Sequence, residues 1–359
     1  MADSSARPWA AEAIRRLALD ARRSGPTPLV PLRFPAFPEI DIYLKDESAQ
    51  PTGSVKHRLV RTMFREAIAG GTLTEGTEVV AATSGAVAVA GAYFARLVGL
   101  GFTTVLPSST PPSALARIGE YGGRWRFGEL PPAAVQDEAR DLAGRSGGYF
   151  LDHFAGAVEA GRADGEGTVA EEVFAGLREE RFPDPAWIVT GAGTGATSAG
   201  IGRYLRRRGL STRLAVVDPE NSAYFPAWAS GCDDYATGMP SRIPGIGRPR
   251  TEPGFVPDLI DLVIPVPDGA SVAAMRRLHR HPGIECGPAA GTGLWGVCHL
   301  VARMRRAERR GSVVALSGDH AEAYRGTYLD GEWLAAKGLD PMPYETVLDR
   351  FAESGEWPG

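Results

Sequence analysis

The amino-acid sequence predicts an α/β protein with two doubly wound domains and mostly parallel sheets. In both halves of the chain, short apolar stretches are followed by turns of small residues and then by helical patterns. This alternation is typical of parallel sheets covered by helices. The chain has 359 residues, enough for two domains of ordinary size. Its 43% hydrophobic and 23% charged content is that of a folded globular protein.

The first half of the chain contains three predicted strands, each followed by a helix. Before them, apolar residues at helical spacing over 10–19 predict an amphipathic helix, which the sequence at 24–26 ends. The strands are expected at 40–44, 78–82 and 101–106, and the helices over 56–69, 86–97 and from 111 onward.

The alternation resumes at about residue 185. Strands are expected at 187–190, 214–218, 262–266 and 313–316, with helices over 198–208 and 293–310. Pro265 cannot donate a ladder hydrogen bond, so its stretch is predicted to be an edge strand or a strand end. A stretch rich in glycine and proline at about 222–257 is either a surface excursion or an active-site lid.

Charge and composition limit the partners we expect. The net charge is −4 and the sequence pI is about 5.9, so no basic excess is left for nucleic-acid phosphates. The sequence has neither the pattern of a secretory signal nor an apolar run of about 18 residues, so no membrane association is expected. Cys232, Cys286 and Cys298 lack the spacing of a metal site and suit a reducing compartment. We therefore expect a cytoplasmic protein without a metal.

Lysine is scarce in this chain, which makes each lysine informative. Only three of the 39 basic residues are lysines, namely Lys45, Lys56 and Lys337. A lysine amine forms a Schiff base, whereas a guanidinium does not. Lys56 lies between a predicted strand and a predicted helix, at the kind of strand end where parallel sheets bind ligands. We expect Lys56 to carry chemistry; the alternative is a solvated surface lysine.

A glycine-rich turn at 191–197 is a candidate phosphate site. Glycines let backbone N–H groups approach a phosphate, and the start of the following helix adds a favourable dipole. The alternative is a tight turn between a strand and a helix. No Gly-Lys-Ser/Thr follows, so the turn is not a Walker loop. Asp218 ends the next strand at the distance expected of a dinucleotide fingerprint, which leaves a nicotinamide- or flavin-dependent oxidoreductase open.

Three further segments follow predicted strands or begin predicted helices. Thr83, Ser84 and Gly85 are a possible cradle for a carboxylate. The small-residue turn at 287–293 either packs a helix closely on the sheet or lines a site. Asp319 and His320 close the last predicted strand, where a histidine is either structural or catalytic.

Taken together and in this order, these segments resemble the fold-type II pyridoxal-phosphate enzymes of the cysteine synthase and cystathionine β-synthase family. Within that family the chain looks most like bacterial L-cysteine desulfhydrases. The resemblance covers roughly residues 20 to 335. The stretches that carry it are 45–48, PTGSVKHR at 51–58, 92–97, GAGTG at 191–195, 217–222 and 245–250.

The resemblance implies a site that binds pyridoxal 5′-phosphate. Lys56 would be the Schiff-base lysine. The cofactor phosphate would be held by Gly193, Thr194, Gly195, Ala196 and Thr197, and the substrate carboxylate by Thr83, Ser84, Gly85 and Val87. The resemblance also implies a tryptophan synthase β-like fold, with a smaller mobile domain at 45–155 that carries Lys56. Residues 1–44 and 156–359 would form the larger domain, and the enzyme would be a homodimer.

Three segments depart from the family pattern. The loop after Gly85 has Ala86 and Val87 where the family has Asn or Ser and then Thr, so the side chains that contact the cofactor's phenolic oxygen and the carboxylate are missing. Ala289 stands where a hydroxyl or thiol usually meets the pyridine nitrogen, which could instead face Thr292, His320 or water. The family's Asp-Ser-Gly is replaced by Asp-His-Ala at 319–321. The lysine and the phosphate turn remain, which indicates retained cofactor binding with a changed substrate or a lost activity.

By the resemblance, the reaction would be a β-elimination from cysteine or a related β-substituted amino acid. It would proceed through an aminoacrylate to pyruvate and ammonia, with release of a β group such as sulfide. Three alternatives stay open: a β-replacement synthase of the cysteine synthase type, a dinucleotide-dependent oxidoreductase and a non-catalytic family member.

Overall fold

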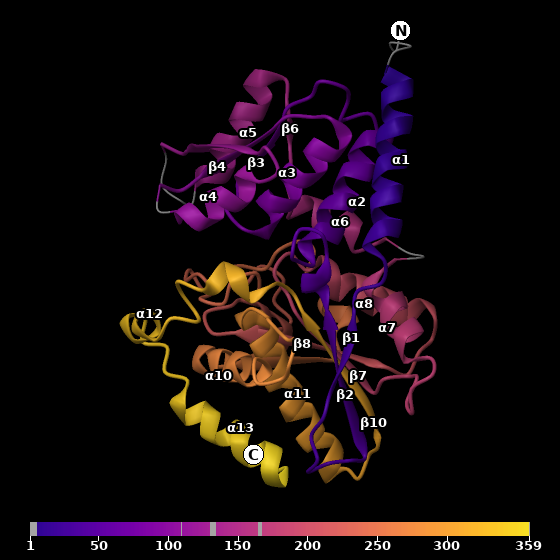
Figure 1. Cartoon of the computed structure of the whole chain (residues 1–359), viewed down its shortest axis with the longest axis vertical. Helices are drawn as coiled ribbons and strands as arrows, with labels where there is room; N and C mark the ends of the chain where they lie inside the picture. Colours follow the sequence, from indigo (N-terminus) through magenta and orange to yellow (C-terminus); the bar gives the residue numbers. More distant parts are fainter. Residues whose placement is uncertain (1–5, 109, 130–133, 164–166, 359) are drawn as a thin grey trace. The chain divides into compact units, whose positions relative to one another are not determined.

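The computed structural model describes residues 6–108, 110–129, 134–163 and 167–358 (Figure 1). Tertiary contacts divide the chain into two compact units. Unit 1 comprises Met1–Gly25 and Gln50–Ala160, and unit 2 comprises Pro26–Ala49 and Gly161–Gly359. Each unit has its own sheet. The predicted α/β class with mostly parallel sheets is confirmed.

Unit 1 is built on a four-stranded parallel sheet in the order β5-β4-β3-β6. Its strands are β3 (Val79–Ala81), β4 (Phe102–Leu106), β5 (Arg124–Phe127) and β6 (Tyr149–Phe150). The central strands β3 and β4 are almost wholly buried, because helices cover both faces of a parallel sheet.

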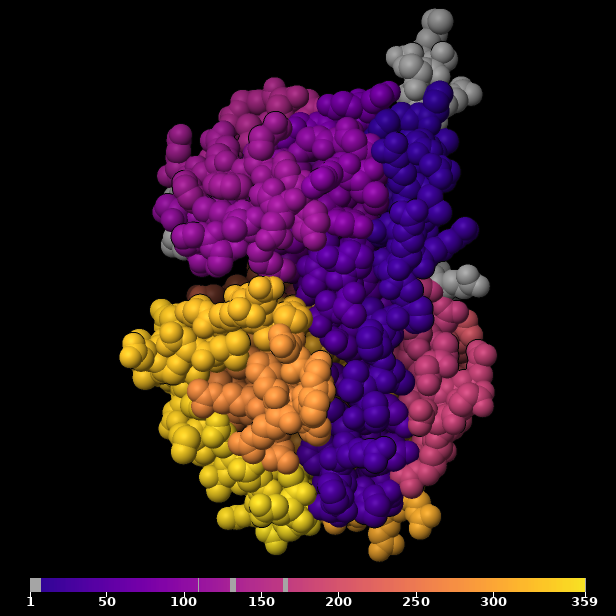
Figure 2. Space-filling view, in the orientation of Figure 1, coloured from indigo at the N-terminus to yellow at the C-terminus, as the bar shows by residue number. Residues whose placement is uncertain are grey.

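The helices of unit 1 form two layers around this sheet. They are α1 (Ala6–Ser24), α2 (Lys56–Ala69), α3 (Ala86–Val98), α4 (Pro112–Gly119), α5 (Val135–Ser146) and α6 (Ala155–Ala160). Helix α5 packs on β3, β4 and β6 through a small apolar cluster, and α3 packs on β3 and β4. Helix α1 lies along the outer edge of unit 1, where Figures 1 and 2 show it in indigo, and it packs on both α2 and α3.

Unit 2 contains a six-stranded sheet in the order β1-β2-β10-β7-β8-β9. The strands are β1 (Leu29–Leu32), β2 (Ile40–Asp46), β7 (Trp187–Gly191), β8 (Arg213–Pro219), β9 (Leu262–Val266) and β10 (Gly311–Ser317). Only the edge strand β1 runs antiparallel to its neighbour, and the other pairs are parallel. The carboxyl ends of β7 and β10 therefore meet at one edge of the sheet.

Helices cover both faces of the unit 2 sheet. They are α7 (Val169–Leu177), α8 (Ala196–Arg207), α9 (Tyr224–Ser230), α10 (Asp268–Leu278), α11 (Pro288–Arg306), α12 (Gly331–Ala336) and α13 (Met342–Ser354). One core cluster joins the sheet to α10, α11 and α13, and the other joins it to α7 and α8. Among the described residues, no helix is long and apolar enough to cross a membrane.

The elements expected from the sequence are present, and the structure adds some that were not expected. The strand at 262–266 is an edge strand, β9, in which Pro265 is exposed. Strands β1, β5 and β6 were not expected. Helix α1 belongs to unit 1, whereas we expected residues 1–44 to join the larger domain. The physical reason is that α1 buries Leu17 and Asp20 beside α2 and α3.

Candidate functional site

The three lysines lie in different environments. Lys45 is buried in β2, where its ammonium Nζ donates to Glu172 Oε2 at 2.7 Å and to Thr27 O at 2.6 Å. Lys337 is exposed at the end of α12, 5.9 Å from the centre of the Trp333 ring. Lys56 is partly buried and is the first residue of α2. Lys45 thus has a structural role and Lys337 lies on the surface, which leaves Lys56 as the candidate for chemistry.

The turn before α3 is shaped by a pair of threonines. Thr104 Oγ1 in β4 donates to Thr83 O at 2.8 Å and accepts from Thr83 N at 3.3 Å. Gly85 N donates to Thr83 Oγ1 at 3.3 Å, and Gly85 is the N-cap of α3. The N–H groups of Ala86 and Val87 are in the first turn of α3, where a helix has no internal acceptors. Backbone amides at a helix start can bind a carboxylate.

Lys56 and this turn both lie in unit 1. Each is at the N-terminal end of a helix, α2 or α3, and these two helices pack on one another. Ser84 is partly buried, and the side chain of Val87 is only 5% exposed. Neither Ala86 nor Val87 brings a polar side chain, so the polar groups of this turn are those of the backbone, Thr83 and Ser84.

The glycine turn of unit 2 connects β7 to α8 and has no room for side chains at two positions. Gly195 has a φ of +85°, and a Cβ there would lie 2.2 Å from the carbonyl carbon of Gly254. A Cβ on Gly191 would lie 2.4 Å from Ile246 Cγ2. Contacts this short essentially never occur for real Cβ atoms, so a larger residue at either position would displace its neighbour.

Three hydrogen bonds hold the carbonyl groups of the same turn in place. The Tyr224 hydroxyl donates to Gly193 O at 2.5 Å, and Gly247 N donates to Ala192 O at 2.8 Å. Ser198 Oγ donates to Gly195 O at 3.0 Å. With these carbonyls engaged, the amides of the first turn of α8 are the groups that remain to bind an anion. The turn therefore fits the phosphate of a cofactor.

The stretch at 222–257 packs against the glycine turn. It contains α9, and its apolar residues Ile246 and Phe255 are buried. The ring of Phe255 stacks on that of Tyr224 with centres 4.1 Å apart. Part of the stretch is thus structural, in addition to the excursion or lid that the sequence indicated.

Asp218 is buried at the end of β8 and is not presented to a nucleotide. Its side chain is 1% exposed, and its Oδ2 accepts from Phe225 N at 2.7 Å. Among the described residues, its Oδ1 has no hydrogen-bond partner. Burial raises the pKa of Asp218 to about 6, and hydrogen bonds from Ser222 and Phe225 offset only part of this effect. An acidic residue that binds a ribose hydroxyl must be accessible, so the dinucleotide interpretation loses its support.

The structure also shows what Thr292 and His320 contact. Thr292 is fully buried in α11 and its hydroxyl donates to Ser271 Oγ at 2.8 Å. His320 Nδ1 accepts from Glu322 N at 3.2 Å, and its Nε2 is 3.4 Å from a carboxylate oxygen of Glu285. Both side chains thus have partners within unit 2. Ala289 lies in the first turn of α11, with a methyl group packed against the core.

Sequence reasoning missed the residues that hold the site in shape. Thr104 and Tyr224 act on Thr83 and Gly193, which are 21 and 31 residues away in the chain. His57, next to Lys56, is fully buried against Asp20, which is 37 residues away. No local pattern marks such long-range partners; only the position of His57 beside Lys56 was a usable signal.

The comparisons with known proteins agree with this geometry. A family model described as pyridoxal-phosphate dependent enzyme matches residues 21–319. The chain is 46% identical over 358 residues to L-cysteine desulfhydrase Cds1 of Mycobacterium tuberculosis, covering 99% of this chain and 97% of that protein. It is 28% identical over 316 residues to cysteine synthase B of Escherichia coli, covering 86% and 94% of the two chains.

A solved structure supports the same assignment. The crystal structure of O-ureido-L-serine synthase superposes with a TM-score of 0.73 at 26% identity, covering 88% of this chain and 98% of that one. The family model covers well over half of the sequence, and the resemblance inferred from the motifs is confirmed. The chain therefore belongs to the family of pyridoxal-phosphate dependent enzymes.

Proposed function

We propose that this enzyme is a lyase that acts on L-cysteine or a related β-substituted amino acid. With cysteine, the substrate and one water give pyruvate, ammonia and sulfide. The observation that carries the proposal is the 46% identity to an L-cysteine desulfhydrase over 99% of the chain. The retained Lys56 and glycine turn support it, because both are needed to use the cofactor.

In this proposal, different residues hold the cofactor and the substrate. Lys56 would bond the cofactor through its amine, and the turn from Gly193 to Thr197 would hold the phosphate with its amides. The turn from Thr83 to Val87 binds the substrate carboxylate. When bound, pyridoxal phosphate supplies the electron sink that makes the α-proton of an amino acid acidic.

Lys56 also moves a proton in this proposal. With cofactor and substrate bound, the Lys56 amine would lie next to Cα and would accept the Cα proton as a general base. The same ammonium group can then deliver a proton to the departing β group. Placement at the first turn of α2, whose backbone is held by the unit 1 core, restricts where this amine can reach.

The three departures from the family pattern bear on specificity. Without a polar side chain at 86 or 87, the substrate carboxylate is bound by Thr83, Ser84 and backbone amides. Ala289 has no hydroxyl or thiol for the cofactor ring, and Thr292 and His320 are engaged elsewhere. This set of contacts favours a substrate whose β substituent is bulkier or less polar than the thiol of cysteine.

A β-replacement synthase is the second candidate, because cysteine synthase B and O-ureido-L-serine synthase are among the relatives. The two reactions share the first half and differ in whether water or a second nucleophile enters. In an assay with O-acetylserine as the substrate, added sulfide would then lower the yield of pyruvate in proportion, and cysteine would form instead. This result would favour replacement.

The absorbance spectrum and borohydride trapping test the proposal. The purified protein should absorb at visible wavelengths, and borohydride should fix the cofactor on the Lys56 peptide. Lys56→Ala should lose this adduct, and the exposed Lys337→Ala is the matched control that should keep it. Pyruvate and sulfide from L-cysteine then test the reaction. A reducible chromophore in Lys56→Ala, or no cofactor in the wild type, would contradict the assignment.

The assembly and location are part of the same proposal. The enzyme would act as a homodimer with a mobile smaller unit in the cytoplasm, where its three free cysteines stay reduced. Light scattering at micromolar concentration should show a dimer, and a species of only 38.1 kDa would contradict it.

A further inference from the structure

The imidazole next to Lys56 is held on both of its nitrogens. His57 is fully buried, with Nε2 3.1 Å from Asp20 Oδ2 in α1 and Nδ1 3.2 Å from Thr52 Oγ1. The rings of Tyr93 and Phe94 in α3 lie against it, with centres 5.2 and 4.6 Å from that of the imidazole. Since His57 follows Lys56 directly in the first turn of α2, these contacts fix the backbone that carries the lysine.

The protonation states of His57 and Asp20 determine which atom donates in each of these hydrogen bonds. Burial lowers the pKa of His57, and the Asp20 carboxylate offsets only part of that shift, so the imidazole is neutral. Burial alone would raise the pKa of Asp20, but hydrogen bonds from His57 and Tyr93 outweigh it and leave this pKa lowered. The ionised Asp20 therefore accepts from the Nε2–H of His57, and the Nδ1 of His57 accepts from the Thr52 hydroxyl.

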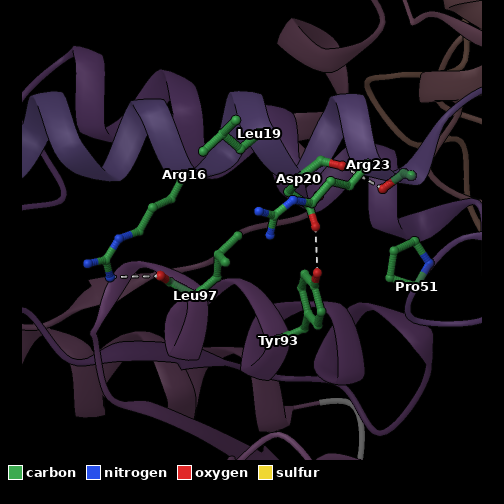
Figure 3. A pocket seen from close by; sticks show the side chains of 8 residues that line it. Arg16, Leu19, Asp20, Arg23, Pro51, Tyr93 and Leu97 are labelled. Atoms are coloured by element: carbon green, nitrogen blue, oxygen red, sulfur yellow. Dashed lines mark hydrogen bonds between the residues drawn. The ribbon is translucent and has the colours of Figure 1, made fainter.

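Asp20 is also held by α3 and borders a cavity. The Tyr93 hydroxyl donates to Asp20 Oδ1 at 2.5 Å, as Figure 3 shows. A cavity of about 190 Å³ adjoins the carboxylate between α1 and α3, with Arg16 and Leu97 among its lining residues. All of these groups lie in unit 1. The carboxylate is thus the point where α1, α2 and α3 meet.

We propose that His57 and Asp20 are positioning residues for Lys56. Asp20 orients the imidazole, and the imidazole holds the first turn of α2, so that the Lys56 amine is kept where it meets the cofactor aldehyde. This inference rests on the proposed function, in which Lys56 bonds the cofactor. It adds α1, which no motif of the resemblance includes, to the parts of the chain that the reaction needs.

Two forms of the cofactor distinguish a positioning role of His57 and Asp20 from a role in folding. Pyridoxal 5′-phosphate has the aldehyde that reacts with Lys56, whereas pyridoxine 5′-phosphate has an alcohol there and binds without a bond to lysine. With the full-length protein freed of cofactor, the rate of adduct formation reports on Lys56. The Kd of pyridoxine 5′-phosphate reports on the phosphate turn in unit 2.

We expect the variants to slow adduct formation at Lys56 without weakening the binding of pyridoxine 5′-phosphate. His57→Ala should slow adduct formation by roughly 10- to 100-fold, the cost of misplacing a reacting group by about 1 Å. The Kd of pyridoxine 5′-phosphate should stay as in the wild type. His57→Gln keeps an N–H at the position of Nε2, so it should recover most of the rate. Asp20→Ala should slow the reaction like His57→Ala, and the double variant should be no slower than His57→Ala, because the two residues act as one unit.

Trp9→Phe is the matched control for stability. It removes a different hydrogen bond between α1 and α3, from Trp9 Nε1 to Val98 O at 3.1 Å, without touching His57. This variant should be less stable than the wild type but form the adduct at the normal rate.

Three results would overturn the proposal. Unchanged adduct formation in both His57→Ala and Asp20→Ala would show that neither positions Lys56. Equal losses of adduct rate and of pyridoxine 5′-phosphate affinity would show a merely structural role, as would a slow Trp9→Phe. If His57→Ala does not fold, His57→Gln and Asp20→Ala still decide the matter. A wild type that forms no adduct at Lys56 would instead refute the proposed function.

Discussion

Replacing Gly195 with alanine tests whether the glycine turn holds the cofactor phosphate. The new Cβ would be 2.2 Å from both the carbonyl carbon and the oxygen of Gly254, whereas ordinary contact begins at 3.4 Å. The two backbone segments must therefore separate by about 1 Å. The φ of +85° adds a conformational cost of about 1–2 kcal/mol for a residue with a Cβ.

Such a displacement moves the amides at the start of α8. Loss of one hydrogen bond to a charged group costs about 1.5–3 kcal/mol, which is roughly 10- to 150-fold in Kd. We expect Gly195→Ala to weaken pyridoxine 5′-phosphate by at least about tenfold in calorimetry and to lower the melting temperature.

Gly200 provides the matched control on the same helix. Its nearest neighbour would be Gly161 O at 3.9 Å, so a Cβ fits without displacement. Gly200→Ala should bind normally and be about 0.5–1 kcal/mol more stable, because alanine is the better helix former. Equal affinity in Gly195→Ala and Gly200→Ala would refute the assignment of the phosphate to this turn.

Three further changes have defined outcomes. Because the pKa of Asp218 is raised to about 6, the folded state binds a proton more tightly than the unfolded state does. The free energy of unfolding should therefore fall by about 2 kcal/mol as pH rises from 4 to 6, and Asp218→Asn should flatten this slope in urea unfolding. Lys45→Met leaves a buried carboxylate without its ammonium partner and should cost about 3 kcal/mol or more, whereas the exposed Lys337→Met should cost almost nothing; equal stabilities would contradict the structural role. Ala86→Asn with Val87→Thr restores two polar side chains and should raise kcat/KM for L-cysteine by roughly tenfold; unchanged turnover would show that this turn does not limit the reaction.

The central parts of both sheets could be predicted from the sequence because their strands are short, apolar and followed by small-residue turns. Among the edge strands, β9 has this signal, whereas β1, β5 and β6 lack it. Strand β1 contains Pro31 and has an exposed residue there, and β5 alternates arginine with the exposed aromatic residues Trp125 and Phe127. Residues at a sheet edge are not selected for burial on both faces, so their composition resembles that of a loop.

The site could be predicted only where local composition carries the chemistry. Lys56 was identifiable because lysine is rare here, and the turn at 191–197 because glycine is dense. The contacts of Tyr224 with Gly193 and of Asp20 with His57 join segments far apart in the chain. Such pairs follow from tertiary packing, which no pattern in either segment reports.

The order of strands in unit 2 has a consequence for how the chain folds during synthesis. Strand β2 pairs with β10 in a register that joins Ile40 to Gly311, whereas unit 1 ends at residue 160. At elongation rates of about 5–20 residues per second, the ribosome needs on the order of tens of seconds to synthesise the residues between β2 and β10. Unit 1 can fold in this time. Until β10 has been synthesised, the edge of β2 that pairs with it stays without its partner strand. Nascent chains stalled before β10 should therefore be bound by chaperones through residues 29–46.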